Sequence, residues 1–358
     1  MHGSFKYLLR CLFLFILPFF LITDAYAVTI GVSFPNTTSQ RWKAEGEYLK
    51  SFLEEDGYDI LFSIAENDSN TQIKDIEKMI ADDCKVLVIA CVDELSLTDV
   101  LAKAKAKNIK VIAYDRLIRN TDAIDYFATF DHYEVGVKQA KYIVDRLHLG
   151  ISPKTYNIEL FSGSPLGNVA KNIYEGSMSV LKPYFDNGIL VCPSGQISFD
   201  ETSTMHWKGA EAQKRLKSLF DLYKYEKNKG EKSLDIILGA SDSIATALVK
   251  SLVSEYGYKC SDIPLITGQD CSLDAARYIG KGLQSMCVFK DSRVLAYQVK
   301  EMINCMLEGV DVPVNDNLTY HNGVKNIPTY LCSSVTVDRN NLKETLVESE
   351  YYSAKDLK

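Results

Sequence analysis

The chain has 358 residues, of which 46% are hydrophobic and 24% are charged, so its composition is that of a globular protein. Its length exceeds the ~250–300 residues at which single hydrophobic cores stop growing, which predicts two cores. The formal net charge is -7 and no long basic run occurs, which argues against nucleic-acid binding through phosphate contacts.

Residues 1–27 have the pattern of a secretory signal peptide. Two basic residues precede an apolar run over 11–22, and the small residues Ala25 and Ala27 match a cleavage site. The apolar run is shorter than the ~20 residues that a membrane-spanning helix needs. We therefore expect a soluble, exported mature chain that begins at Val28.

Strands and helices are predicted in strict alternation through the first part of the mature chain. Apolar strands are predicted at 28–34, 59–65, 86–91 and 111–114. Helices follow the first three strands, and the second helix is predicted to begin with a capping box formed by Ser69 and Gln72. This alternation predicts an α/β fold, with a parallel sheet covered by helices on both faces.

The pattern restarts after the stretch "FATFD", which ends at Asp131 and is a candidate hinge. A helix follows it, and further strands are predicted at 157–161, 189–191, 234–240 and 264–270. The chain is therefore predicted to form two similar α/β units.

Nearly every predicted strand is followed by polar or charged side chains. Ligands of open parallel sheets bind beyond the carboxyl ends of the strands, so we expect these side chains to meet in one cleft. Carboxylates accept hydrogen bonds from vicinal hydroxyls, and guanidinium or ammonium groups donate in return, which suits a small polyhydroxylated ligand. The candidate ligand-binding residues are Arg41, Trp42, Asp115, Arg116, Asn168, Trp207, Asp242, Asp270 and Lys290.

The only two tryptophans of the chain, Trp42 and Trp207, both fall in loops on this side of the strands. Their aromatic faces could bury the C–H surfaces of a sugar ring, and core packing is the alternative interpretation of each. Eight cysteines remain after removal of the signal segment. Their spacing shows no CxxC pair or Cys/His cluster, so we expect buried free thiols, no metal site and no cofactor.

Several stretches, taken in order, resemble the periplasmic type I sugar-binding proteins of the xylose-binding and multiple-monosaccharide-binding branch. They span nearly the whole mature chain and include "RW" at 41–42, "IAYDRLI" at 112–118, "SGSP" at 162–165, "GQD" at 268–270 and "FKD" at 289–291.

The resemblance implies two Rossmann-like lobes, each a parallel sheet covered by helices, joined by three hinge crossings that close around a pyranose. We expect an N-terminal lobe of 28–131 plus 271–311, and a C-terminal lobe of 132–270 plus 312–358, with crossings near Phe130, Gln269 and Val312. The resemblance also implies that the sugar is contacted by Arg41, Asp115, Arg116, Asp270 and Lys290.

The same resemblance implies a location and partners. We expect a monomeric protein in the periplasm of a Gram-negative bacterium that passes a monosaccharide to the permease of an ABC importer. A chemoreceptor or sensor kinase is a possible further partner. A sugar-sensing receptor without a transport role, or a binder of another small polyol, remains an alternative.

One loop departs from the family pattern. Where the family has Asp-Asn-Asn-Ala, this chain has Gly167, Asn168, Val169 and Ala170, and Ser241 stands where an Asn or an aromatic residue is common. Loss of two hydrogen-bonding groups predicts weaker binding or a changed sugar preference, since each charge-assisted bond contributes ~1.5–3 kcal/mol.

Three other functions fit the sequence less well. Asp115 and Asp270 could form the carboxylate pair of a glycoside hydrolase, but the neighbouring Arg116 and Lys290 would keep both acids ionised. A transcription regulator would need an N-terminal DNA-reading module, and a signal peptide stands there instead. A dinucleotide-dependent dehydrogenase would need a GxGxxG after the first strand, where the chain reads "GVSFPNTTS".

Overall fold

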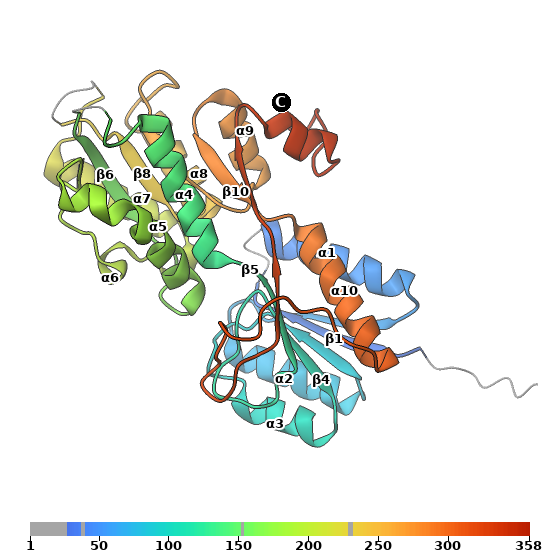
Figure 1. Cartoon of the computed structure of the whole chain (residues 1–358). Helices are drawn as coiled ribbons and strands as arrows, with labels where there is room; N and C mark the ends of the chain where they lie inside the picture. Colours follow the sequence, from blue (N-terminus) through green and yellow to red (C-terminus); the bar gives the residue numbers. More distant parts are fainter. Residues whose placement is uncertain (1–26, 37–39, 152–153, 228–231) are drawn as a thin grey trace, which may run out of the picture.

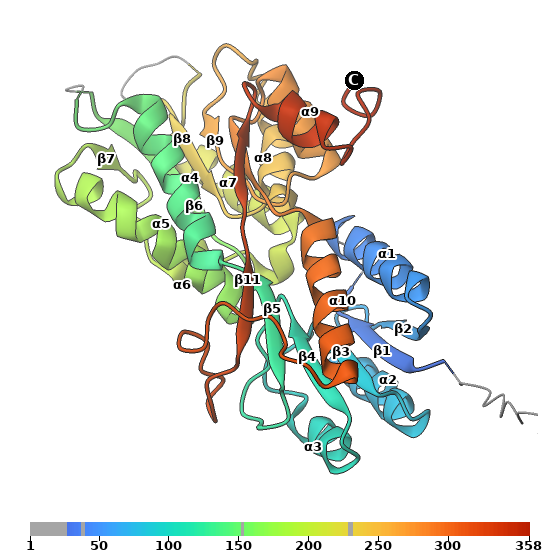
Figure 2. The same ribbon diagram turned by 45° about the vertical axis from the view of Figure 1, so that its right-hand side comes forward.

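The computed structural model describes residues 27–36, 40–151, 154–227 and 232–358. The predicted signal segment therefore lies outside the described residues, except for Ala27. Within the described part, no helix combines the length and the apolar character needed to cross a membrane. The chain forms two α/β lobes joined by extended crossings (Figures 1 and 2).

The N-terminal lobe contains a six-stranded sheet with the order β11-β5-β4-β3-β1-β2, in which every pairing is parallel. Its strands are β1 (Thr29–Phe34), β2 (Asp59–Ile64), β3 (Val86–Ile89), β4 (Lys110–Tyr114), β5 (Tyr126–Phe130) and β11 (Thr329–Cys332). The central strands are apolar throughout because helices cover both faces of the sheet.

Helices α1 (Gln40–Glu55) and α10 (Ser292–Glu308) pack against each other and form one core with the sheet. Helices α2 (Ser69–Ala81) and α3 (Thr98–Ala106) form a second core with the same sheet. Figure 1 shows the two helix pairs on opposite sides of the strands.

The C-terminal lobe has a parallel sheet with the order β7-β6-β8-β9, formed by β7 (Leu190–Val191), β6 (Tyr156–Phe161), β8 (Ile236–Gly239) and β9 (Leu265–Ile266). One core contains α7 (Gly209–Tyr223) and α8 (Asp242–Ser254), and the other contains α4 (His132–Leu147) and α5 (Asn168–Asp186). Short helices α6 (Phe199–Thr202) and η1 (Met205–Trp207) precede α7.

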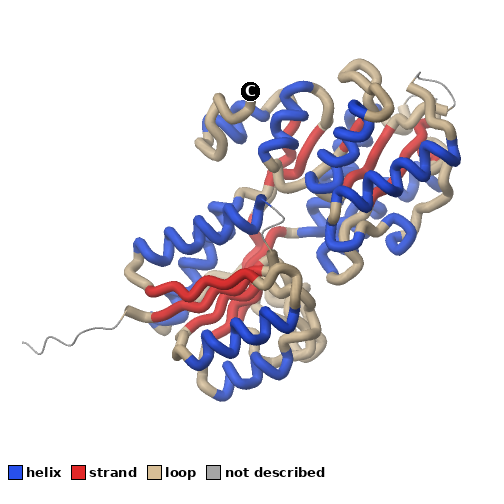
Figure 3. The backbone as a smooth tube through the Cα atoms, turned by 180° about the vertical axis from the view of Figure 1, so that it is seen from behind, coloured by secondary structure: helices blue, strands red, loops and turns tan. Residues whose placement is uncertain are grey.

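The remaining elements complete this lobe: α9 (Leu273–Lys281), β10 (Met286–Phe289), β12 (Val335–Asp338) and η2 (Lys343–Glu348). Strand β10 pairs with β12 in antiparallel fashion, and a parallel bridge from Gln269 to Val288 connects it to the β9 side. Figure 3 shows the two groups of strands, one in each lobe, from behind.

The chain crosses between lobes three times, and two crossings differ from those expected. The first follows β5 at Phe130, as expected; the second lies between β10 and α10; and the third lies between β11 and β12. Residues 273–289 therefore belong to the C-terminal lobe and residues 329–332 to the N-terminal lobe, which is the reverse of the expected division. Helix–strand alternation identifies elements but does not reveal which sheet each strand joins.

The N-terminal cap of α2 differs from the expected one. The side chain that caps α2 is Asp68, which accepts hydrogen bonds from the N–H groups of Asn70 and Thr71, so the capping box at Ser69 and Gln72 was wrong. Gln72 is buried instead, and its amide bonds Ser33 Oγ and the carbonyl of Ala90. All eight cysteines of the described chain are free thiols, six of them buried.

Candidate functional site

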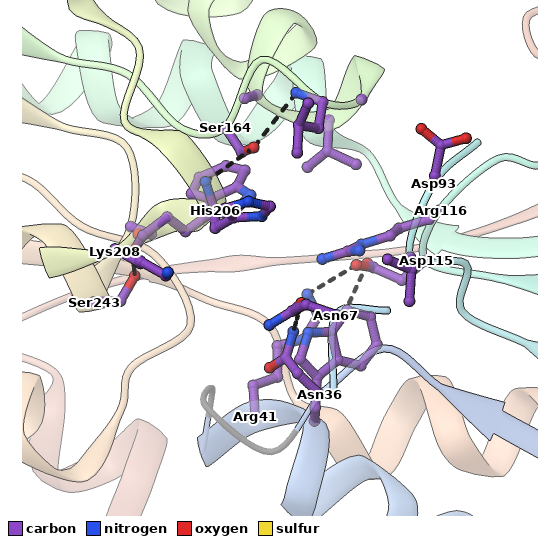
Figure 4. Close-up of a pocket in the computed structure, with 18 of the residues that line it drawn as sticks. Asn36, Arg41, Asn67, Asp93, Asp115, Arg116, Ser164, His206, Lys208 and Ser243 are labelled. Atoms are coloured by element: carbon purple, nitrogen blue, oxygen red, sulfur yellow. Dashed lines mark hydrogen bonds and ion pairs between the residues drawn. The ribbon is translucent and has the colours of Figure 1, made fainter. Parts of the chain in front are cut away.

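A cavity of about 290 Å³ lies between the two lobes, at the carboxyl ends of the strands. This is near the lower end of the ~300–1,000 Å³ typical of small-molecule sites. In Figure 4, Asn36, Asn67, Asp93, Asp115 and Arg116 of the N-terminal lobe face Ser164, His206, Lys208 and Ser243 of the C-terminal lobe.

The structure brings most of the predicted ligand-binding residues together around this cavity. Those that line it are Arg41, Trp42, Asp115, Arg116, Trp207, Asp270 and Lys290. They come from loops and helix starts far apart in the sequence, and their meeting follows from the parallel arrangement of the strands.

Asn168 and Asp242 are not among the residues that line the cavity, although their neighbours Gly167, Val169 and Ser241 are. Asp242 is 2% exposed, and its carboxylate accepts hydrogen bonds from Ser272 N at 2.7 Å and from Gln284 Nε2 at 3.1 Å. Asn168 is the first residue of α5, and Asp242 is the first residue of α8. The structure therefore places Asp242 in an internal network of the C-terminal lobe.

Arg41 and Asp115 form the charged floor of the cavity. Arg41 Nη1 donates to Asp115 Oδ2 at 3.0 Å, and Nη2 lies 2.8 Å from Oδ1. The Nε of Arg41 donates to Glu45 Oε1 at 2.7 Å. This planar, two-point contact fixes the guanidinium, because both of its edges are held by carboxylates.

Asp115 is ionised at neutral pH. Burial alone would raise its pKa, but the charges of Arg41 and Lys290 outweigh burial and hold the pKa well below its usual range. Burial lowers the pKa of His132 to about 4, so this ring is neutral at pH 7. An ionised Asp115 accepts hydrogen bonds but has no proton to give, which argues against a general-acid role.

Asp270 and Lys290 form the second charged pair and extend the cluster to the other lobe. Lys290 Nζ lies 3.0 Å from Asp270 Oδ1 and is 1% exposed. Arg41 Nη1 lies 3.9 Å from the same oxygen, across the cleft. Gln269 beside it lines the cavity, is 3% exposed and has an Oε1 without a hydrogen-bond partner in the described chain.

The two tryptophans differ in their surroundings. Trp42 is 6% exposed, and its ring packs edge-on against Phe34 at 5.4 Å between centroids, with the guanidinium groups of Arg41 and Arg116 5.0 and 5.3 Å from its centroid. It therefore lines the cavity and also belongs to the core of the N-terminal lobe.

Trp207 enters the cavity from the C-terminal lobe. Its ring lies against Gly163 so closely that a Cβ there would be 2.1 Å from Trp207 Cη2. The backbone of Trp207 is left-handed, with φ of 58°, and so is that of His206, with φ of 53°. A left-handed bulky residue costs ~1–3 kcal/mol and is held only when its surroundings determine it, which is common at ligand sites.

Asp115 and Asp270 share this left-handed backbone, with φ of 58° and 93°. Aspartate tolerates this region better than most residues. Hydrogen bonds hold both turns: the N–H of Asp115 donates to the carbonyl of Ala128, and the N–H of Asp270 donates to the carbonyl of Val288. The turn directs each side chain from its strand end toward the cleft.

Sequence reasoning missed several lining residues, mostly in the loops after β2 and β3. Asn67 follows β2, and its Oδ1 accepts a 2.8 Å hydrogen bond from Asn36 Nδ2. Asp93 and Glu94 follow β3. The strand-end rule would have found all three if it had been applied to these two strands. Ser164 follows β6 and could have been found by the same rule, whereas the turn that brings in His206 and Lys208 has no comparable sequence signal.

No group of three or more His, Cys, Asp or Glu side chains able to hold a metal ion occurs in the described parts of the chain. A buried cleft between two hinged α/β lobes, lined by hydrogen-bonding groups held by ion pairs, defines a solute-binding protein.

Comparisons with known proteins agree with this class. Residues 30–310 match the family model described as periplasmic binding protein domain. A multiple sugar-binding periplasmic protein of Azospirillum brasilense is 43% identical over 331 residues, which cover 92% of this chain and 91% of that relative. A multiple sugar-binding periplasmic receptor of Rhizobium radiobacter is 42% identical, with 92% of each chain covered.

Solved structures give the same result. A solute-binding protein of an ABC transporter from Clostridium phytofermentans, with bound β-D-glucose, is 42% identical; its TM-score is 0.86, with 92% of this chain and 100% of that chain covered. A carbohydrate transporter solute-binding protein from Chloroflexus aurantiacus, in complex with D-glucose, is 29% identical; its TM-score is 0.81, with 92% and 98% covered. The chain belongs to the periplasmic binding proteins of type I, close to the sugar-binding members, a family of solute-binding proteins rather than enzymes.

Proposed function

We propose that this protein captures a monosaccharide, an aldose in its pyranose form, in the interlobe cavity and delivers it to an ABC importer. Export through a cleaved signal peptide into the periplasm of a Gram-negative bacterium is part of the proposal. The contact set consists of Arg41, Trp42, Asp115, Arg116, Trp207, Asp270 and Lys290.

The observation that carries the proposal is the convergence of Asp115, Asp270 and Gln269 on one small cavity. The carboxylates of Asp115 and Asp270 are held by Arg41 and Lys290, which orients their acceptor oxygens. Each carboxylate can accept from two adjacent hydroxyls of a sugar ring. The tryptophans offer apolar surface for the C–H faces of the ring. The sugar-binding names of the relatives and the glucose in the similar structures support this ligand class.

Closure between the lobes follows from the three crossings and from the Arg41–Asp270 contact that spans the cleft. A ligand that touches both lobes shifts the open–closed equilibrium by as much as it binds the closed form better.

The test is calorimetry of the purified protein with D-glucose, D-galactose, D-xylose and L-arabinose, together with native mass spectrometry for a co-purifying sugar. We expect one site and a mass increase that matches one monosaccharide. Asp115→Ala should abolish binding, and the isosteric Asp115→Asn should weaken it while it preserves the left-handed turn. Absence of binding by wild type to every sugar tested would disprove the proposal.

A second role is sugar sensing, in which the closed protein binds a chemoreceptor or the periplasmic domain of a sensor kinase. The relative from Rhizobium radiobacter, which is named a receptor, favours this role. Binding of the sugar-loaded but not the sugar-free protein to such a domain would support it.

A further inference from the structure

Glu94 joins the two lobes at one edge of the cavity. It follows β3 in the N-terminal lobe and is 8% exposed. Its Oε1 accepts a hydrogen bond of 2.7 Å from the backbone N–H of Asn168, the first residue of α5 in the C-terminal lobe. Because the two partners stand on opposite sides of the cleft, this bond requires the lobes to be close together.

The helix that donates this bond has no side-chain cap of its own. Its cap position is Gly167, which has no side chain to accept from the first turn of α5. The first N–H groups of a helix need an acceptor, which Ser, Thr, Asp or Asn normally supplies at the cap position. A carboxylate there is favoured further by the helix dipole. Glu94 supplies this acceptor from the other lobe.

Gly167 also leaves the space that Glu94 occupies. A Cβ at position 167 would lie 2.8 Å from Glu94 Oε1 and 3.5 Å from its carboxyl carbon. The backbone of Gly167 is extended, with φ of -170°, so any residue could adopt its conformation. Glycine is therefore required by the approach of Glu94 and not by the backbone.

The loop that carries Glu94 is held firmly in the N-terminal lobe. Leu95 N donates to Asp93 Oδ1 at 2.9 Å, and Arg119 N donates to the carbonyl of Glu94 at 2.8 Å. Burial raises the pKa of Glu94, and the hydrogen bond from Asn168 opposes that rise. An enclosed carboxylate without its donor is costly, so removal of either partner penalises the closed form.

We propose that Glu94 is a positioning residue that fastens α5 to the N-terminal lobe when the cleft closes. Gly167 and Val169 both line the cavity, so the position of α5 sets how closely this wall approaches the ligand. Part of the free energy of closure then comes from a contact between the lobes rather than from the ligand. The inference rests on the proposed function for the ligand, whereas the contact itself is independent of it.

The experiment compares wild type with Glu94→Ala, Glu94→Gln and the control Asp68→Ala. Asp68 also caps a helix with its carboxylate, but cap and helix belong to the same lobe, and Asp68 does not line the cavity. The Kd and koff are measured by tryptophan fluorescence, since both tryptophans line the cavity. The probes are D-glucose, D-galactose, D-xylose and L-arabinose. Thermal midpoints and small-angle scattering of the sugar-free and sugar-saturated proteins complete the set.

We expect Glu94→Ala to raise the Kd about tenfold, mainly through koff, and to enlarge the mean radius of gyration of the sugar-free protein. Glu94→Gln keeps an acceptor oxygen without the charge, so its Kd should fall between those of wild type and Glu94→Ala. Asp68→Ala should lower the thermal midpoint and keep the Kd within about twofold of wild type.

A Kd for Glu94→Ala within twofold of wild type would overturn the inference. An equal loss of affinity in Asp68→Ala would also overturn it, because loss of any helix cap would then explain the effect. If wild type binds none of the four sugars, the proposed function fails instead. The small-angle scattering of the sugar-free proteins then decides the inference. Equal radii of gyration for wild type and Glu94→Ala would overturn it.

Discussion

The guanidinium of Arg41, on α1 of the N-terminal lobe, lies 3.9 Å from the carboxylate of Asp270, which enters the cavity from the C-terminal lobe. Each group is also held within the cluster, Arg41 by Asp115 and Asp270 by Lys290. The charges that line the cavity are therefore fixed on both sides of the cleft and attract each other across it.

Asp270→Asn should weaken sugar binding about 100-fold, which corresponds to about 2.7 kcal/mol. The amide cannot neutralise Lys290, which is 1% exposed, and it removes the attraction to Arg41 across the cleft. Asparagine tolerates the left-handed backbone at this position, so the fold should persist. Calorimetry measures the loss. The control is Asp274→Asn, whose side chain is 65% exposed; equal affinities for the two variants would contradict the role of Asp270.

Gly167→Asp should weaken binding about tenfold, although the family pattern by itself suggests that an acid at this position would strengthen it. A side chain at 167 meets Glu94 Oε1, and two carboxylates would repel each other there. The loss should therefore shrink when Gly167→Asp is combined with Glu94→Ala. A double-mutant cycle of Kd values measures this coupling. Additive losses, or tighter binding by Gly167→Asp alone, would contradict the steric and electrostatic argument.

Gly163→Ala should weaken binding and reduce the change in tryptophan fluorescence on sugar addition. The new Cβ would overlap the ring of Trp207, at 2.1 Å from Cη2, and displace it from the cavity wall. The matched control is Gly280→Ala in α9, where no atom lies within 4 Å of the added Cβ. That variant should bind as wild type does and gain slightly in stability. Unchanged fluorescence in Gly163→Ala would show that Trp207 does not depend on this contact.

Asp242→Asn should remove a pH dependence of stability. Burial and the charge of Asp270 raise the pKa of Asp242 to about 7. Hydrogen bonds from Ser272, Cys287 and Gln284 oppose this rise. In the unfolded chain the carboxyl titrates near ~3.9, so the folded state holds a proton more tightly. The contribution of Asp242 to the free energy of unfolding is therefore fully present below pH ~3.9 and is lost as the pH rises through about 7.

Across this range the loss is about 4 kcal/mol, at ~1.36 kcal/mol for each pKa unit. Urea unfolding between pH 5 and pH 8 should show about 2.7 kcal/mol of this decline, because two pKa units lie between pH 5 and about 7. The same decline should occur in a control with Asp221→Asn, since Asp221 is exposed. It should be absent or strongly reduced in Asp242→Asn. Parallel pH profiles for wild type and Asp242→Asn would contradict a shifted Asp242.

Local sequence patterns were enough to predict the alternation of strands and helices and seven of the residues that line the cavity. Asp115 was found because a polar residue that directly follows an apolar strand of a parallel sheet lies at the edge where ligands bind. The same rule selected Asp242, which directly follows the turn after β8, but its side chain points into the lobe. The rule locates the Cα atom, whereas the backbone conformation of that residue decides where its side chain points. Asp115 has a left-handed backbone conformation, and Asp242 is the first residue of a helix.

The amino-acid sequence by itself determined the α/β class, the alternation of elements and the group of charged strand ends, because hydrophobic periodicity and strand-end chemistry are local properties. Only the tertiary structure decided that β10 pairs with β12, that β11 joins the first sheet, and that Glu94 reaches Asn168. These are contacts between residues far apart in the chain. Their partners are selected by the packing of whole lobes, which no local pattern of residues encodes.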